Sequence, residues 1–320
     1  MKSAVLFLVF NRPDTTRQVF DTIRAARPPK LYVAADGPRP NRAGEAERCA
    51  EVRRIATNVD WPCEVKMLFR ELNFGCKMGV SGGINWFFEH EPEGIILEDD
   101  VLPVASFFDY CDELLERYRN DERVALVSGC NLVSRRFKPK ESYFFSRYNH
   151  IWGWASWRRA WQHYDVTMED WPNWRDTGSL ARIGNGSRLF TAYWRELFDK
   201  MHRGEIDTWD YQWTFTCWRL GMLSILPSEN QTHNLGFGTD ATHTLAETPD
   251  CVAESMPKEL EFPLAHPNTV ERQVEADKLL DERVFNLNLK SFLKCKLQKN
   301  STFKKYQRIA NQIINKIFIL

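Results

Sequence analysis

The stretch AVLFLVFNRPDTTRQVFDTIRAA, residues 4–26, decides the fold of this chain. Its first seven residues are all apolar, which is typical of a strand that is covered on both faces. Pro13-Asp14 then ends the strand, and Val19, Phe20 and Ile23 recur at the spacing of one helix face. The stretch therefore predicts a buried strand followed by a helix, the unit from which parallel sheets are built.

The same alternation continues to about residue 130. Predicted strands at 30–36, 63–69, 94–100 and 123–129 alternate with predicted helices at 43–57, 76–89 and 104–119. This order predicts an α/β fold with an open, mostly parallel sheet flanked by helices, whose ligands bind beyond the carboxyl ends of the strands. Polar residues follow those strand ends, and we expect them on one rim: Asn11, Arg12, Asp36 and the acids 98–100.

The fourth strand ends in three consecutive acids, in GIILEDDVLP at residues 94–103. Adjacent carboxylates repel one another, and a divalent cation bound to hard oxygen ligands relieves that repulsion. The alternative is an acidic N-terminus for the helix that follows. We favour a Mn²⁺ or Mg²⁺ site, because three acids exceed what a helix cap requires.

Composition and charge exclude several classes of protein. The chain has 320 residues and no net charge, but residues 290–320 hold eight basic residues and no acid. Removing those eight from the 43 basic residues leaves 35 against 43 acidic ones, which argues against nucleic-acid binding. The eight cysteines form no C-x-x-C pair and fit reduced cytosolic thiols. MKSAVLFLVF lacks a cleavage site and predicts a first strand rather than a signal peptide, and no stretch is long enough to span a membrane.

The character of the chain changes after about residue 143. Half of the 12 tryptophans fall between Trp152 and Trp174, followed by predicted helices at 188–201 and 208–220. We therefore divide the chain into an N-terminal α/β half (1–130), an aromatic-rich half (131–265) and a basic helical tail (266–320).

The strand that ends in Glu-Asp-Asp resembles the DXD-type motif of GT-A-fold glycosyltransferases. It is most similar to the N-acetylglucosaminyltransferase I family and to bacterial hemolytic-protein-like glycosyltransferases. The resemblance covers about residues 4–245 in order, through five segments: VLFLVFNRPDTTRQVFDTI (5–23), VAADGPR (33–39), LEDDVLPVASFFDYCDELLERYRND (97–121), IWGWASW (151–157) and TWDYQW (208–213).

The resemblance implies that residues 1–130 bind the nucleotide sugar and that residues 131–265 bind the acceptor and carry catalysis. It also implies roles at the rim. Asp100 would be the direct metal ligand, with Asp99 and His243 as further candidates. Glu98 and Asp99 would contact the donor sugar and ribose, and Arg12, beside Asn11, would meet the diphosphate. Asp36 would bond the nucleoside base.

The resemblance also implies the general base. Asp210 would take the proton of the acceptor hydroxyl as that oxygen attacks the anomeric carbon. The family has two adjacent acids in W-D-D-W, whereas Trp209-Asp210-Tyr211-Gln212-Trp213 has one acid and one extra residue. Asp207, one turn earlier, is the alternative base, and a solvated helix acid is the structural alternative.

Three further features have a functional and a structural interpretation. Arg70 and Lys77 flank a glycine-rich segment that either approaches a nucleotide phosphate or packs closely against a neighbour. Trp152-Gly153-Trp154 either contacts a sugar or belongs to the core. The loop 232–244 carries His233 and His243, of which His243 is the metal candidate although a single histidine is more often structural.

In the tail, apolar residues recur every three or four positions from Phe303 to Ile317, with basic residues between them. This pattern fits an amphipathic helix that lies on an anionic membrane, and it equally fits a terminal helix that docks onto the body of the protein. These observations predict a metal-dependent, inverting glycosyltransferase that moves a sugar from a nucleotide-diphospho donor, with UDP-sugar favoured. Its acceptor would be a glycan or a lipid-linked molecule. The enzyme would be cytoplasmic and would act at the inner face of the cell membrane. The alternatives are a sugar-phosphate nucleotidyltransferase and a non-catalytic carbohydrate- or membrane-binding protein.

Overall fold

The computed structural model describes residues 1–236 and 249–288. Its strands are β1 (Val5–Val9), β2 (Lys30–Ala35), β3 (Glu64–Phe69), β4 (Glu93–Glu98), β5 (Val101–Pro103), β6 (Val124–Ser128), β7 (Tyr143–Ser146), β8 (Trp154–Trp157), β9 (Leu223–Pro227) and β10 (Thr232–Asn234). Its helices are α1 (Pro13–Ala26), α2 (Glu45–Ala56), α3 (Gly75–His90), α4 (Ser106–Arg117), α5 (Arg158–Trp161), α6 (Trp171–Trp174), α7 (Ser179–Ile183), α8 (Arg188–His202), α9 (Asp210–Leu220), α10 (Asp250–Glu254) and α11 (Val274–Arg283). The predicted alternation of strand and helix as far as β6 is confirmed, except that β5 follows β4 directly.

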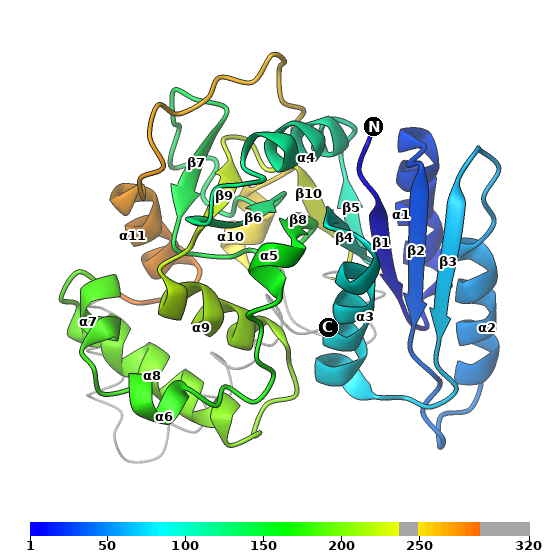
Figure 1. Cartoon of the computed structure of the whole chain (residues 1–320), viewed down its shortest axis with the longest axis horizontal. Coiled ribbons are helices and arrows are strands. Elements are labelled where there is room, and N and C mark those ends of the chain that lie inside the picture. Colours follow the sequence, from blue (N-terminus) through cyan, green and yellow to red (C-terminus); the bar gives the residue numbers. More distant parts are fainter. Residues whose placement is uncertain (237–248, 289–320) are drawn as a thin grey trace.

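One sheet runs through both halves of the chain, in the order β3-β2-β1-β4-β8-β6-β9-β7 (Figure 1). The β1, β2, β3 and β4 strands are mutually parallel, and β6 is parallel to β9. The β8 strand runs antiparallel to both of its neighbours, and β7 runs antiparallel to β9. The fold is therefore α/β with a mixed, mostly parallel sheet, as predicted, and it is consistent with a GT-A-like fold.

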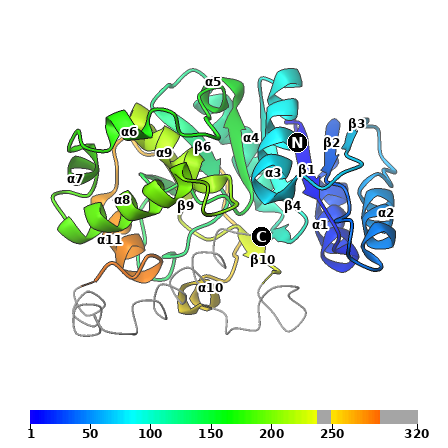
Figure 2. The ribbon, with the colours of Figure 1, turned by 90° about the horizontal axis from the view of Figure 1, so that it is seen from below.

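Helices cover both faces of this sheet because its strands are apolar on both sides (Figure 2). On one face Phe7 of β1 packs against Phe20 of α1, with ring centroids 6.5 Å apart. On the other face Leu8 meets α3, where a Cβ built on Gly83 would lie 2.8 Å from the leucine side chain. Glycine at this position lets α3 approach the sheet closely, which is the structural interpretation of the glycine-rich segment.

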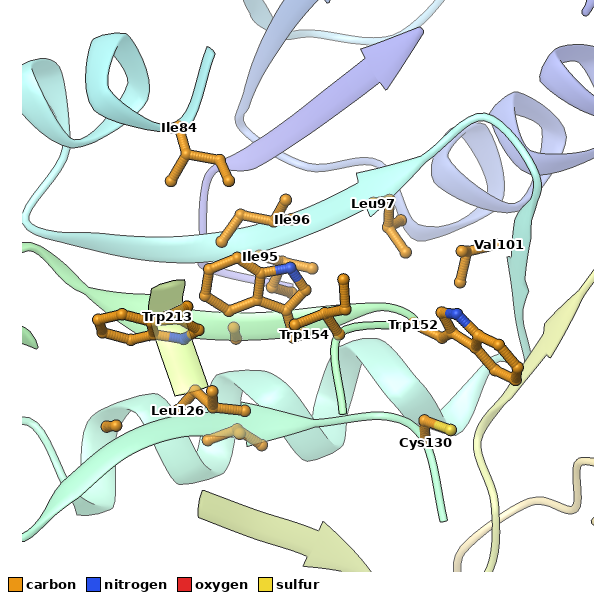
Figure 3. Packing of buried hydrophobic residues seen from close by; sticks show 14 of the residues in the cluster. Ile84, Ile95, Ile96, Leu97, Val101, Leu126, Cys130, Trp152, Trp154 and Trp213 are labelled. Atoms are coloured by element: carbon orange, nitrogen blue, oxygen red, sulfur yellow. The ribbon is translucent and has the colours of Figure 1, made fainter. Parts of the chain in front are cut away.

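The tryptophan-rich segment supplies β8, which the sequence alone did not predict. Trp154 pairs in register with Ile96 of β4, stacks with Trp209 at 5.8 Å between ring centroids, and packs in the layer shown in Figure 3. Trp157 points to the opposite face and donates its indole N–H to the carbonyl of Leu115 in α4. Most of the six clustered tryptophans are core residues, as expected, and the buried ones are Trp152, Trp154, Trp157, Trp161 and Trp171.

A second, two-stranded sheet explains the apolar run after the acids. β5 begins directly after Asp100 and pairs antiparallel with β10, through Leu102 and His233. Glu98 is the last residue of β4, and Asp99 and Asp100 connect β4 to β5. The triplet therefore does not open a helix, and α4 begins only at Ser106.

Two properties concern the whole described part of the chain. None of its helices is long and apolar enough to cross a membrane. Its cysteines are free thiols: Cys49, Cys63, Cys76, Cys111, Cys130, Cys217 and Cys251. The predicted membrane helix of the tail lies outside the described residues, and the division of the chain at residues 130 and 265 stays a prediction.

Candidate active site at the carboxyl edge of the sheet

The acidic triplet and Arg12 form one buried cluster at the carboxyl ends of β1 and β4. Asp100 is completely buried, and Arg12 Nη1 donates to its Oδ2 at 2.8 Å. Arg12 also lies 3.6 Å from Oδ1 of Asp99. Asp99 is fixed from β1, since its Oδ2 accepts the backbone N–H of Phe10 at 2.9 Å. The parallel pairing of β1 with β4 brings these residues together, although they are almost 90 positions apart in the chain.

Burial of three carboxylates beside one guanidinium perturbs all of them. Burial raises the pKa of Asp100 to about 7, although Arg12 opposes that rise. Burial also raises the pKa of Asp99, and it raises that of Glu98 well above its usual range, with repulsion from the other two acids adding to the shift. Burial by itself would lower the pKa of Arg12, but attraction to the three acids outweighs it and leaves that pKa raised.

One fully buried oxygen of this cluster has no hydrogen-bond partner within the described residues. Asp100 Oδ1 is buried and unpartnered within the described residues. A hard carboxylate oxygen of this kind suits Mn²⁺ or Mg²⁺. Across residues 1–236 and 249–288, however, no group of three or more His, Cys, Asp or Glu side chains is placed to hold a metal ion by itself. A cation at Asp100 would therefore need further ligands from a bound molecule.

Asp210 is the first residue of α9 and lies close enough to the triplet to act on it electrically. Its charge raises the pKa of Glu98. Asp210 is 3% exposed, and burial raises its own pKa to about 7, while the hydroxyl of Thr208, which donates to its Oδ1, opposes the rise. A carboxyl group with this pKa is suited to accept a proton near neutral pH.

Asp207, the alternative base, occupies a different place. It is exposed, and its Oδ1 accepts the backbone N–H of Lys77 at 3.3 Å in the first turn of α3. A Cβ built on Gly75 would lie 2.9 Å from Asp207 Oδ2, and Gly75 adopts a positive φ of 76°. Asp207 therefore contacts the start of α3, whereas Asp210 is buried beside the triplet.

A small cavity lies beside Asp210. It is lined by Tyr148, Asn149, His150, Trp194, Asp210, Tyr211, Thr214 and Phe285. It leaves about 10 Å³ for the centre of a water molecule, which is room for about one water and far too little for a sugar ring. Asn149 accepts from Thr214 Oγ1 at 2.7 Å, and its buried Nδ2 has no partner within the described residues.

Asp36, expected to bond a base, holds the N-terminus of α3. Its carboxylate accepts the N–H groups of Phe74 at 2.9 Å and Gly75 at 3.2 Å, and Arg70 lies 4.0 Å away. Burial raises its pKa, and the two N–H bonds oppose that rise. Arg70 in turn donates to the carbonyl of Gly79 at 2.8 Å. The structure thus gives Asp36 and Arg70 structural partners in α3, and their ligand roles stay predictions.

Asn11 is held by Glu45, a residue that the sequence did not single out. Its Nδ2 donates to Glu45 Oε1 at 2.9 Å, and Glu45 is buried and also accepts from Arg39. Hydrogen bonds from Arg39 lower the pKa of Glu45 to about 2. Glu45 opens α2, where an acid reads as an ordinary first-turn residue, so the sequence carried no signal for this contact.

The remaining candidates divide between the core and the undescribed segments. Trp152 and Trp154 are buried, with Gly153 between them at a φ of 64°, so a sugar contact of these residues stays a prediction. His233 belongs to β10, and burial lowers its pKa. His243, the metal candidate, lies outside the described residues.

Comparison with known proteins finds similar solved structures but no matching family model and no matching curated protein. The structure is similar to HddC from Yersinia pseudotuberculosis over 53% of this chain and 80% of that one, with 9% identity and a TM-score of 0.29. It is also similar to mouse xyloside xylosyltransferase 1 in its apo form, over 68% and 81% of the two chains, with 12% identity and a TM-score of 0.30. TM-scores this low carry no argument about fold or function.

Proposed function

We propose that this protein is a metal-dependent glycosyltransferase that moves a sugar from a nucleotide-diphospho donor, UDP-sugar in the first instance, to a glycan or lipid-linked acceptor. One observation carries the proposal: the acidic triplet and Arg12 form one buried cluster at the carboxyl edge of an α/β sheet, and the buried Asp210 lies close enough to raise the pKa of Glu98. Ligands of such sheets bind at that edge. The sequence resemblance to GT-A enzymes runs through the same residues.

In this proposal the chain's own residues divide the work. Asp100, with Asp99, would hold Mn²⁺ or Mg²⁺, which when bound would neutralise charge on the diphosphate. Arg12 would donate hydrogen bonds to diphosphate oxygens, since guanidinium matches such anions well. Asp210 would accept the proton of the acceptor hydroxyl while that oxygen bonds to the anomeric carbon and the bond to the diphosphate breaks. Attack from the face opposite the diphosphate would invert the anomeric configuration.

The first experiment tests coupled binding of donor and metal. Thermal unfolding is followed with UDP alone, with Mn²⁺ alone and with both. We expect clear stabilisation by the pair, because a ligand that binds only the folded state raises the free energy of unfolding by about 2.7 kcal/mol at a hundred times its Kd. Asp100→Asn should lose this effect, whereas Asp109→Asn, an exposed acid of α4, should keep it. Absence of any joint effect in the wild type would contradict the proposal and favour a protein without nucleotide-sugar chemistry.

The second experiment tests the base. UDP release from a panel of UDP-sugars is measured for Asp210→Asn and for the matched variant Asp207→Asn. Loss of a positioned base lowers a rate by roughly 10²–10⁴. We expect that loss for Asp210→Asn with nucleotide binding unchanged, and near wild-type rates for Asp207→Asn. The reverse result would transfer the role to Asp207.

The place of the reaction is also part of the proposal. The acceptor would be presented in the cytoplasm at the inner face of the membrane, where the basic tail would meet anionic lipid.

A further inference from the structure

Arg12 already contacts one carboxylate oxygen of the predicted metal ligand Asp100. Its Nη1 is 2.8 Å from Asp100 Oδ2 and 3.6 Å from Asp99 Oδ1, so it is the positive group that the two aspartates share. It precedes Pro13 at the start of α1, and its backbone carbonyl accepts the N–H of Thr16 at 3.0 Å, which fixes the residue in place. A cation that binds Asp100 therefore shares this carboxylate with the guanidinium, unless the guanidinium moves away.

A metal ion bound to Asp100 would lie within a few ångströms of the Arg12 guanidinium, which already contacts Oδ2 of that residue. Two positive charges within a few ångströms repel strongly at low dielectric. One guanidinium also cannot satisfy three acids, and Asp100 Oδ1 remains without a partner within the described residues. Arg12 therefore partly neutralises Asp100 and competes with a metal ion for it.

Arg12 has the means to leave Asp100. Its side chain is 21% exposed, and within the described residues its guanidinium donates one hydrogen bond, through Nη1. A guanidinium has five N–H donors in a planar fork, so Nε and Nη2 can engage a second anion. A diphosphate at this edge would offer oxygens that pair with the fork in two places, which is stronger than the single contact to Asp100.

We propose that Arg12 is an exchangeable counter-ion: it holds Asp100 while the site is empty, and it transfers to the diphosphate when donor and metal enter together. The inference rests on the proposed function and deepens it. Its consequence is that Mn²⁺ binds weakly to the protein alone and tightly once a nucleoside diphosphate has drawn Arg12 away. Such coupling between two ligands is commonly worth 5- to 150-fold in affinity.

The test measures Mn²⁺ binding without nucleotide, by electron paramagnetic resonance of the free ion at pH 8. We expect Arg12→Gln to bind Mn²⁺ about tenfold more tightly than the wild type, because the competing charge is gone. The same variant should bind UDP about tenfold more weakly in saturating Mn²⁺, because the fork is gone. Arg12→Lys, which keeps the charge without the fork, should bind Mn²⁺ like the wild type and UDP like Arg12→Gln.

The matched control is Arg17→Gln, on the same helix and paired with Glu51 at 3.4 Å on the surface. It should change neither affinity. Equal or weaker Mn²⁺ binding by Arg12→Gln would overturn the inference, even if UDP and Mn²⁺ still stabilise the wild type together. If the wild type shows no joint effect, the proposed function fails, while the nucleotide-free comparison still decides whether Arg12 opposes the metal. Should Arg12→Gln fail to fold, a wild-type-like Mn²⁺ affinity of Arg12→Lys supports the inference and a tighter one overturns it.

Discussion

Two buried clusters of arginine and carboxylate, one beside β4 and one beside β7, differ in their charge balance. The rim cluster consists of Arg12, Glu98, Asp99 and Asp100. The α11 cluster consists of Arg147, Arg272, Asp277 and Asp281. The first has one cation for three acids, whereas the second has two cations for two acids.

The α11 cluster is also closely bonded. Arg147 donates to Asp281 at 2.6 Å, and Asp277 accepts from Arg272 and from the hydroxyl of Ser146. Both arginines also donate to the carbonyl of Ile183, at 2.6 and 2.9 Å. These bonds attach α11 to β7. A balanced, bonded cluster stabilises the fold, whereas an excess of buried acid is a cost that a bound cation can remove.

The largest expected effect breaks the balanced cluster. Asp277→Ala leaves two buried arginines with one acid, and loss of one partner of a buried pair costs about 3–5 kcal/mol. We expect that loss in the free energy of unfolding measured with urea. Asp109→Ala, an exposed acid of α4, is the control and should change it by less than about 0.5 kcal/mol. A similarly small loss for Asp277→Ala would show that the α11 cluster does not stabilise the fold.

The next effect concerns pH. Because the pKa of Asp210 is raised to about 7, the base is ionised above that pH and protonated below it. The rate of sugar transfer should therefore fall about tenfold per unit as the pH drops below 7. Asp100 has a similar pKa, so binding of UDP and Mn²⁺ must be measured over the same range. A rate that stays flat from pH 5 to 8 under saturating ligands contradicts the assignment of Asp210.

A smaller effect sharpens the contrast at the rim. Asp100→Asn removes a buried charge, keeps an acceptor for Arg12, and should raise stability by about 1 kcal/mol while binding is lost. The sign follows from the raised pKa. Below the unfolded pKa of Asp100 both states hold the proton, and stability is lost as the pH rises toward about 7. The gain of the variant should therefore be absent near pH 3 and complete above pH 7, by thermal unfolding at each pH. A destabilised variant above pH 7 would contradict the view that the rim cluster is a cost.

The smallest expected effect is the loss of unfolding free energy when an ion pair at the surface is broken. Arg119 donates to both oxygens of Glu93, at 2.7 and 2.8 Å, and is half exposed. Glu93→Gln should cost less than about 1 kcal/mol in urea unfolding, because solvent screens such pairs. A loss as large as that of Asp277→Ala would remove the distinction between buried and exposed clusters.

Local patterns in the sequence predicted much of the fold. The apolar run at 4–10 and the helical spacing after Pro13 are visible without any tertiary contact, and β1 and α1 have the predicted places. The strands β7 and β8 were not predicted, because an aromatic stretch fits a core helix as well as a core strand. The β5 strand was not predicted, because acids before an apolar run also fit the start of a helix.

The sequence by itself determined the order of most strands and helices in about the first 130 residues and the kinds of charge at the strand ends, since propensity and periodicity act between near neighbours. The tertiary structure decided which of those charged groups are already engaged. Asp36 accepts a backbone N–H group at the start of α3, Asn11 donates to Glu45, and Asp207 accepts the backbone N–H of Lys77. Each partner lies more than 30 positions away in the chain, so only folding brings the two together. The same long-range pairing places Arg12 on Asp100 and leaves one carboxylate oxygen of that residue unbonded.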